Sequence, residues 1–246
     1  MSIITPAFNS EKFIASAIES VRSQTYSNFE MLIVVDSGTT DNTANIVKDY
    51  EKKDPRIRLI TITERGLALS RNKAIEESIG QYIAFLDSDD LWLPEKLERQ
   101  LKFMTETGAK FSCTAYRRSS EDLKTTGNLI TVPAIATYTD LLKNNTLACL
   151  TVIYDQTDLQ NLKMQSVRGE DYRLWLEISR KGYDCYGLNE DLARYRFVEN
   201  SLSRQFVRTI LDRWRTYTQN ERLNPIKATY YMLWYLSTAL LKRKQF

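Results

Sequence analysis

Three carboxylates fall within four residues in the segment Asp87-Ser88-Asp89-Asp90, where the side chains most clearly carry chemistry. At low local dielectric, carboxylates this close repel each other by roughly a few kcal/mol unless a cation neutralises them. Carboxylate oxygens are the ligands that hard divalent ions such as Mg²⁺ and Mn²⁺ take, often together with diphosphate oxygens. On its own, such a cluster is more often a solvated acidic turn in which Asp90 caps the next helix. It predicts a metal site only if other polar segments lie beside it.

Two further acidic segments widen this chemistry, and each keeps two interpretations. The segment Asp36-Ser37-Gly38-Thr39-Thr40-Asp41 follows an apolar run, and its first carboxylate could hydrogen-bond the base or ribose of a nucleoside. An ordinary strand-to-helix turn, capped by Thr40 or Asp41, explains the same residues. The segment Glu170-Asp171-Tyr172 opens a helix, where a carboxylate stabilises the helix dipole or serves as a general base.

The composition decides which residue types can carry acid–base or metal chemistry. The sequence has no histidine, which excludes Ser-His-Asp and Cys-His nucleophilic sites and histidine-ligated zinc. Its cysteines, Cys113, Cys149 and Cys185, are far apart and lack metal-ligand spacing, as expected in a reduced, cytosolic setting. Proton transfer must therefore use carboxylates, hydroxyls, Lys or Tyr, and a carboxylate is the natural candidate for a base.

Strand and helix signals alternate through the first half of the chain. Short apolar runs predict four strands, at residues 2–5, 31–35, 57–62 and 82–86. Apolar residues at helical spacing predict helices between them, at 10–24, from about 41 onward, and at 67–78. We expect Pro6 to end the first strand, Asn9 or Ser10 to cap the first helix, and Gly80 to end the third helix.

This order predicts an α/β fold with an open, mostly parallel sheet connected in the right-handed sense. Ligands of such sheets bind beyond the carboxyl ends of the strands. Three polar loops follow those ends: Pro6–Asn9, Asp36–Asp41 and Asp87–Asp90. We expect them to converge on one crevice, which turns the acidic cluster from an isolated turn into a candidate metal site.

The second half of the chain is less regular. Helices are predicted at 93–105, opened by Pro94, and at 171–181, with Trp175 on the apolar side and Gly182 after the end. A strand is predicted at 111–116, whereas residues 117–165 show no clear pattern. Two more helices are expected near 205–220 and 226–243.

Five segments, in order along the chain, resemble the inverting glycosyltransferases of family two, which have the GT-A fold. They are Thr5–Asn9, Val35–Thr43, Gly66–Asn72, Gly80–Asp90 and Glu170–Trp175. The segment from Tyr195 to Ser203 and the tail are similar to enzymes that build bacterial surface polysaccharides. The resemblance implies a GT-A domain at 1–205, with a nucleotide-sugar half at about 1–116 and an acceptor half at about 117–205. Residues 206–246 would form a C-terminal helical extension.

The resemblance also implies roles for the matched residues. Asp36 would bind the base or ribose of a nucleotide-sugar, in a donor site shared by Pro6, Ala7, Phe8, Asn9, Ser37, Arg71, Asp87 and Ser88. Asp89, with Asp87, would ligate Mn²⁺ or Mg²⁺ bridging the diphosphate, and Asp171 would be the catalytic base. The acceptor side would be lined or supported by Glu170, Trp175 and Arg196.

Two positions depart from the family pattern. The family often has a second Asp where this chain has Ser37, which either weakens a base contact or shifts it onto Asp36. Some relatives carry a histidine after the Tyr195-Arg196 segment that touches metal or phosphate. Here Phe197 or Val198 takes that place, so the sequence does not supply this third metal ligand.

These features predict an inverting glycosyltransferase that moves a sugar from a nucleotide-diphosphate donor, expected to be a UDP-sugar, to a saccharide hydroxyl. The acceptor would be a growing polysaccharide or a lipid-linked oligosaccharide. A nucleotidyltransferase is an alternative, but that class usually has a Gly-rich first loop with Arg or Lys, which Pro6–Ser10 lacks. A catalytically inactive carbohydrate-binding protein is another, and the presence of Asp87, Asp89 and Asp171 argues against it.

The C-terminal tail has two interpretations. Residues 226–241 are rich in aromatic and aliphatic side chains, and Lys242, Arg243 and Lys244 follow. Such a helix lies on an anionic membrane, which would suit a lipid-linked acceptor, or packs on the catalytic domain or on a second subunit of a homodimer. Because we find neither about 18 consecutive apolar residues nor a signal-peptide pattern, we expect a cytoplasmic protein, peripheral at most on the inner membrane face. The net charge of +3 gives no reason to expect a nucleic-acid partner.

Overall fold

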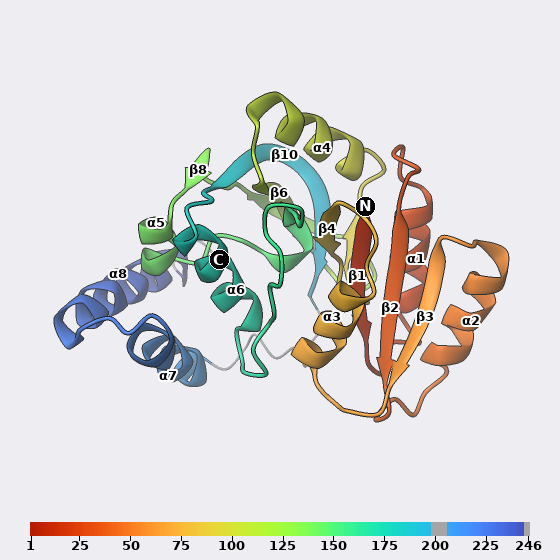
Figure 1. Ribbon diagram of the computed structural model, residues 1–246, viewed down its shortest axis with the longest axis horizontal. Coiled ribbons are helices and arrows are strands. Elements are labelled where there is room, and N and C mark those ends of the chain that lie inside the picture. Colours follow the sequence, from red (N-terminus) through yellow and green to blue (C-terminus); the bar gives the residue numbers. More distant parts are fainter. Residues whose placement is uncertain (198–205, 244–246) are drawn as a thin grey trace.

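The first half of the chain forms four parallel strands joined by helices in the computed structural model, which describes residues 1–197 and 206–243 (Figure 1). The strands are β1 (Ser2–Ala7), β2 (Glu30–Asp36), β3 (Ile57–Ile62) and β4 (Tyr82–Phe85). The helices between them are α1 (Ile14–Arg22), α2 (Thr43–Lys53) and α3 (Leu67–Glu76). Strand β1 lies between β2 and β4, with Ile4 opposite both Leu32 and Phe85. The predicted alternation is confirmed, and β3 has the predicted bounds.

The second half completes the sheet in a less regular way. Two longer strands, β6 (Phe111–Ser119) and β10 (Cys185–Arg196), run parallel, and β9 (Ile153–Asp155) runs antiparallel between β4 and β6. The short strands are β5 (Leu91–Trp92), β7 (Thr126–Ile130) and β8 (Ile135–Ala136). The helices are α4 (Lys96–Thr107), α5 (Tyr138–Lys143), α6 (Glu170–Arg180), α7 (Phe206–Arg215) and α8 (Pro225–Arg243), with single turns at Cys149–Thr151 and Thr216–Asn220.

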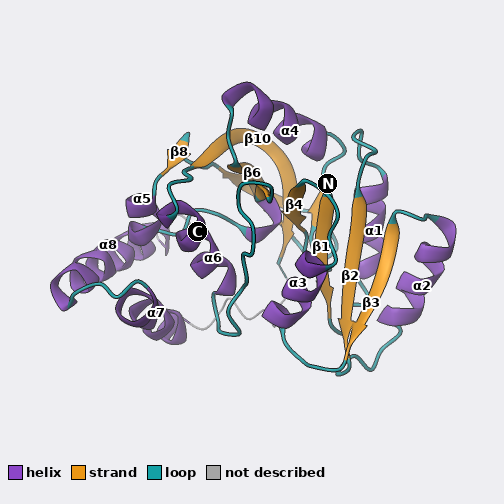
Figure 2. Ribbon diagram, viewed as in Figure 1, coloured by secondary structure: helices purple, strands orange, loops and turns teal. Residues whose placement is uncertain are grey.

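Helices cover both faces of this sheet, whose strand order is β3-β2-β1-β4-β9-β6-β10-β5 (Figure 2). Successive residues of a strand point to opposite faces, so Ile3 and Ile4 belong to different buried apolar clusters. One cluster includes Trp175 of α6, whose ring centroid lies 5.6 Å from those of Phe85 and Phe111. The other includes Ile18 of α1. The predicted α/β fold, with a mostly parallel sheet flanked by helices and a C-terminal helical part, is confirmed.

The stretch without a clear sequence pattern, residues 117–165, supplies the end of β6, β7, β8, α5 and β9. The predicted boundary between the two halves, at 116 and 117, lies inside β6, and the division into halves stays a proposal. Val198 and Ser201–Ser203 lie outside the described residues. In the part of the chain that the structure describes, no helix is both long and apolar enough to cross a membrane.

Several local predictions were wrong because long-range contacts decide these positions. Pro6 does not end β1, which continues to Ala7 beside β2. Helix α1 starts at Ile14, and neither Asn9 nor Ser10 caps it with its side chain; the Ser10 hydroxyl lies 2.7 Å from that of Ser88. Gly80 is no left-handed helix cap. A Cβ atom there would lie 2.6 Å from the carbonyl carbon of Met1, so glycine permits this close approach.

Candidate active site

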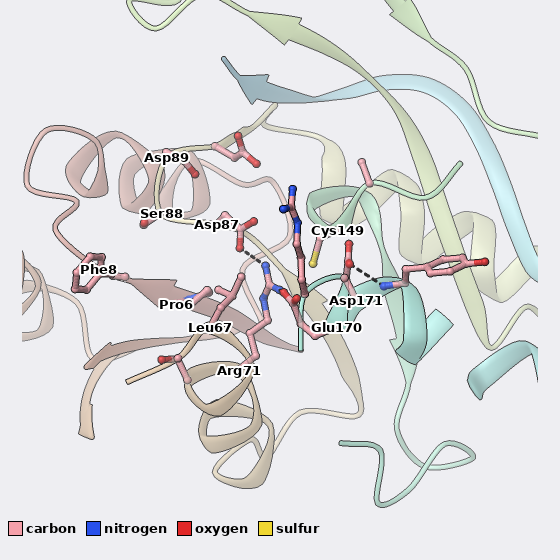
Figure 3. Close-up of a pocket in the computed structure, with 18 of the residues that line it drawn as sticks. Pro6, Phe8, Leu67, Arg71, Asp87, Ser88, Asp89, Cys149, Glu170 and Asp171 are labelled. Atoms are coloured by element: carbon pink, nitrogen blue, oxygen red, sulfur yellow. Dashed lines mark hydrogen bonds and ion pairs between the residues drawn. The ribbon is translucent and has the colours of Figure 1, made fainter. Parts of the chain in front are cut away.

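The three loops at the carboxyl ends of β1, β2 and β4 meet at one cavity of about 1010 Å³ (Figure 3). The start of α6 closes its opposite side, so Asp89 and Asp171 face the same space although they are far apart in sequence. Most of the predicted site residues line this cavity: Pro6, Ala7, Phe8, Asn9, Asp36, Arg71, Asp87, Ser88, Asp89, Glu170 and Asp171. The expected convergence of the three loops is therefore confirmed.

Three predicted residues do not line the cavity. The hydroxyl of Ser37 donates to the carbonyl oxygen of Thr63 at 2.6 Å, away from the cavity. Trp175 lies on α6 and is fully buried in the core, where it packs the helix against the sheet. Arg196 is also buried and holds the acidic loop from outside. The resemblance implied that Trp175 and Arg196 line or support the acceptor side, and the structure favours a supporting position for both.

Asp36 and the loop after β1 form one end of the cavity. The buried Asp36 carboxylate accepts a hydrogen bond from the amide of Gly38 at 2.9 Å, which fixes the turn after β2. The side-chain oxygen of Asn9 accepts from the amide of Thr40 at 2.9 Å and ties the two loops together. Backbone atoms therefore hold the orientation of these two polar loops.

An aromatic ring and a guanidinium group lie beside this end. Phe8 is 46% exposed, and the guanidinium of Arg65 lies over its ring at 5.1 Å. A Cβ atom on Gly38 would lie 2.2 Å from Nε of Arg65, so this guanidinium fills the space that a side chain at position 38 would need. The exposed ring, the cation and the Asp36 carboxylate together suit a flat polar group such as a nucleotide base.

Asp87 and Asp89 form the acidic centre of the cavity. Burial, and then the neighbouring charge of Asp87, raises the pKa of Asp89 to about 6. A divalent cation would relieve this cost, and two carboxylates suit Mg²⁺ or Mn²⁺. The described residues contain no group of three or more His, Cys, Asp or Glu placed to hold a metal. A cation here would thus rest on Asp87 and Asp89, with other ligands from a diphosphate or water.

The third carboxylate of the cluster has a structural partner. Asp90 is buried, and its carboxylate accepts from the backbone amide of Arg196 at 2.8 Å. The guanidinium of Arg196 donates to the carbonyl oxygen of Asp89 at 2.7 Å and to the hydroxyl of Ser16 at 3.0 Å. An isolated acidic turn predicted that Asp90 would cap the next helix, and this prediction was wrong. Asp90 and Arg196 instead fix the backbone of the acidic loop against β10.

Arg71 joins the acidic loop to helix α6. Its guanidinium is 2% exposed and donates to Asp87 at 2.5 Å and to Glu170 at 2.6 Å (Figure 3). The two carboxylates form short, charge-assisted hydrogen bonds with this buried guanidinium. Removing the guanidinium would leave two partly buried negative charges without a compensating positive charge. The donor-site role of Arg71 stays a prediction, and the partners that the structure shows are these two carboxylates.

Asp171 occupies the first turn of α6 and lines the cavity beside this bridge. One carboxylate oxygen accepts from the backbone amide of Tyr172 at 2.7 Å, which orients the group (Figure 3). Burial raises the pKa of Asp171, while the charge of Arg71 opposes this effect. A carboxylate with a raised pKa is a better proton acceptor than an ordinary aspartate, so this position suits a general base.

Part of the cavity comes from residues that sequence reasoning did not assign to the site. Cys149 and Tyr195 line it, and so does the region of α7, through Thr209, Asp212, Arg213 and Thr216. These four residues recur at helical spacing, which could have indicated one helix face. Nothing in the sequence pattern showed that this face turns towards Asp171, because that depends on how the extension packs.

The fold and the site together define a glycosyltransferase of the GT-A type. A mostly parallel sheet presents the Asp36 loop and the acidic Asp87-Ser88-Asp89 turn at its carboxyl ends, opposite the Asp171 carboxylate on a helix. The chain belongs to glycosyl transferase family 2, whose model matches residues 2–161. This membership makes the chain a glycosyltransferase and argues against the nucleotidyltransferase alternative.

Known relatives resemble the chain over nearly its full length. It is 40% identical to the putative teichuronic acid biosynthesis glycosyltransferase TuaG of Bacillus subtilis, covering 99% of this chain and 97% of TuaG. It is 35% identical to the Escherichia coli UDP-Glc:alpha-D-GlcNAc-diphosphoundecaprenol beta-1,3-glucosyltransferase WfgD, covering 98% of this chain and 94% of WfgD.

Solved structures share the fold at lower sequence identity. TarS of S. aureus, in complex with UDP-GlcNAc, has a TM-score of 0.70 and 19% identity over 96% of this chain and 71% of the other. The mannosyltransferase PcManGT of Pyrobaculum calidifontis, in complex with GDP-Man and Mn²⁺, has a TM-score of 0.71 and 18% identity over 94% and 69%.

Proposed function

We propose that this protein transfers a sugar from a UDP-sugar to a hydroxyl of a lipid-linked or growing saccharide in the synthesis of a bacterial surface polysaccharide. One observation carries the proposal: Asp87 and Asp89 share a single cavity with Asp171, and Arg71 bridges the two sides. The names of TuaG and WfgD support the product and acceptor classes, and the TarS complex supports the use of a UDP-sugar.

The donor would lie along the loops of β1, β2 and β4. The base and ribose would contact Asp36, with Phe8 and Arg65 beside the base, and the diphosphate would reach Asp87 and Asp89. Mn²⁺ or Mg²⁺ held by Asp87 and Asp89 would neutralise the charge that develops on the departing diphosphate. The Mn²⁺ complex of PcManGT supports a metal in this role.

Asp171 would act as the base of a single displacement. The acceptor oxygen forms a bond to the anomeric carbon while the bond from that carbon to the diphosphate oxygen breaks, and UDP leaves with the bonding electron pair. The acceptor hydroxyl proton passes to the Asp171 carboxylate, whose position is fixed by its bond from the Tyr172 amide. Because attack and departure use opposite faces of the sugar, the anomeric configuration inverts.

The three cysteines support the proposed cytoplasmic setting. Cys113, Cys149 and Cys185 are all free thiols in the structure, and two of them are buried. A reducing compartment keeps thiols in this state. The proposal therefore places the reaction in the cytoplasm, where the protein would meet a lipid-linked acceptor at the inner face of the membrane.

The experiment that tests this function is an acceptor-dependent assay with UDP-sugars and Mn²⁺. We expect UDP release to require both a saccharide-diphosphate lipid and the metal, to stop in excess EDTA, and to resume when Mn²⁺ is restored. NMR of the product is expected to show an inverted anomeric centre. Retained configuration would disprove the single displacement, and full activity in EDTA would disprove the role of the metal.

A further inference from the structure

The positive charge of the chain is concentrated in its C-terminal extension. Residues 206–246 contain eight Lys or Arg and two Asp or Glu, whereas the whole chain has a net charge of only +3. Residues 1–205 are therefore net negative. Such an asymmetry gives the extension a strong attraction to anionic surfaces that the catalytic domain does not share.

Helix α8 of this extension exposes an apolar stripe, which we call the α8 outer face. It consists of Ile226, Tyr230, Leu233 and Trp234, which are 83%, 50%, 62% and 45% exposed. Spacings of four, three and one residues place these side chains on one side of the helix. Ala228 and Met232, on the other side, are buried against the domain core. The outer face is therefore turned away from the domain core.

Cationic groups border the α8 outer face. Lys227 is exposed next to Ile226, and the ammonium of Lys143 lies 5.8 Å from the centre of the Trp234 ring. Apolar and aromatic side chains flanked by Lys and Arg are the composition of helices that lie in the interface of anionic membranes. Water-exposed stripes of this kind are rare on monomers without a binding role.

We propose that the α8 outer face binds the surface of an anionic lipid bilayer, with α8 parallel to the membrane plane. Ile226, Tyr230, Leu233 and Trp234 would enter the boundary between head groups and acyl chains. Lys227 and Lys143 would pair with lipid phosphates. Apolar burial and charge attraction then act on the same face, which neither a second copy of this basic extension nor a neutral surface would offer.

The packing of the extension connects this membrane face to the catalytic cavity. Helix α7 precedes α8 and lines the cavity through Asp212 and Arg213. The buried guanidinium of Arg213 lies 4.0 Å from the ring of Tyr172 and 4.4 Å from that of Tyr235, so it packs α8 against the helix that carries Asp171. Figure 1 shows α7 and α8 together at one end of the molecule, away from α2. If the proposed function holds, membrane docking would bring a lipid-linked acceptor to the side of the cavity that carries Asp171.

Flotation with lipid vesicles tests the proposal without requiring any activity. We expect the full chain to float with vesicles of phosphatidylglycerol and phosphatidylcholine, and to remain at the bottom with phosphatidylcholine alone or in high salt. Replacing Ile226 and Leu233 by Gln is expected to weaken partitioning at least about tenfold, because both substitutions remove apolar surface that would enter the membrane. Lys227→Glu is expected to weaken it further.

The matched control is Ile79→Gln, which removes an equally exposed Ile (86%) between α3 and β4 and is expected to leave flotation unchanged. Circular dichroism verifies that each variant is folded. UDP release with a water-soluble acceptor reports on the proposed function separately, and we expect it to be unchanged in the Ile226 and Leu233 variant. Wild-type protein that fails to float, or a double variant that floats equally well, would overturn the proposal. So would light scattering that shows a dimer which the double variant dissociates, since a second copy would then cover this face.

Discussion

The two walls of the cavity are built in different ways. The wall proposed to bind the donor, which we call the donor wall, consists of the loops after β1, β2 and β4. It is tied together by backbone amides, such as that of Thr40 donating to Asn9 and that of Glu11 donating to Asp41. The wall proposed to face the acceptor, which we call the acceptor wall, consists of the start of α6 and the inner face of α7. It is held by side chains such as Arg213, which lies between two tyrosine rings. The geometry of the donor wall follows from the sheet, whereas the position of Asp171, the proposed base, depends on a few packing contacts.

Arg71 is the direct joint between these walls. Its two ion pairs reach Asp87 on the donor wall and Glu170 on the acceptor wall. We therefore expect changes on the acceptor wall to affect turnover, changes on the donor wall to affect donor and metal binding, and changes at Arg71 to affect both.

Replacing the proposed base should give the largest change. Asp171→Asn keeps the shape of the side chain but removes its ability to take a proton, so we expect turnover to fall by about 10²–10⁴-fold. The affinity for UDP, measured by calorimetry, should stay within about twofold, because the donor wall is untouched. Asp49→Asn, on the exposed side of α2, is the control. Near-normal turnover in Asp171→Asn would show that another group is the base.

The pH profile of the same reaction gives a second measurement on Asp171. Burial raises its pKa, so the carboxylate loses its charge at a higher pH than an ordinary aspartate. We expect kcat/KM to fall as pH decreases through that pKa, and the acid limb to begin above about pH 4. An acid limb at or below the ordinary aspartate range would contradict the assignment.

Removing Arg71 should affect both walls. Arg71→Met leaves Asp87 and Glu170 without their buried cation, and breaking such a pair costs about 3–5 kcal/mol of stability. Chemical denaturation measures this loss, and we expect weaker UDP binding as well as slower turnover. Adding Glu170→Gln to Arg71→Met should recover part of the stability, because one uncompensated charge is then removed. A variant with normal donor affinity would show that Arg71 belongs to the acceptor wall alone.

Asp89→Asn should act on the donor wall. We expect Mn²⁺-dependent UDP binding to weaken by about 1.4 kcal/mol or more, which is a factor of ten. Since the pKa of Asp89 is about 6 without metal, Mn²⁺ competes with a proton, and its affinity for the wild type should fall as pH drops below about 6. Calorimetry at pH 5 and 7.5 measures both effects, with the exposed Asp122→Asn as control.

The sign of the stability change at Asp89 is opposite to that of a paired carboxylate. Its pKa is raised on folding, so its contribution to stability is present below the unfolded pKa of about 4 and is lost as pH rises through about 6. At neutral pH without metal, we therefore expect Asp89→Asn to be more stable than the wild type. Thermal unfolding in EDTA measures this, and a less stable variant would contradict the raised pKa.

Ser37→Asp should give the smallest effect. It restores the residue that relatives often have, but the Ser37 hydroxyl points to the Thr63 carbonyl and not into the cavity. We expect UDP affinity to change by less than about threefold and stability to fall by about 0.5–1.5 kcal/mol, the value of one hydrogen bond. A tenfold gain in UDP affinity would show that this loop turns towards the nucleotide base when the donor binds.

Much of the fold and part of the candidate site could be predicted from the sequence. Strand and helix periodicity determined the parallel first half, because local apolar patterns report which face of each element is buried. The rule that loops at strand ends share one edge then brought Asp36 and Asp87 together. The elements within residues 117–165 could not be predicted because they are short, as α5 (Tyr138–Lys143) illustrates. Their stability depends on contacts with residues that are distant in the sequence.

The local sequence sets the residue types of the site, their order along the chain and the edge of the sheet where they gather. Which of these residues touch depends on the packing of the whole chain. The bond between Arg71 and Glu170 spans 99 residues, and that between Ser10 and Ser88 spans 78. No local pattern encodes such pairs, because they arise from how helices and loops pack on the finished sheet. The same reason explains why α7 forms a wall of the cavity and α8 turns an apolar face to the surroundings.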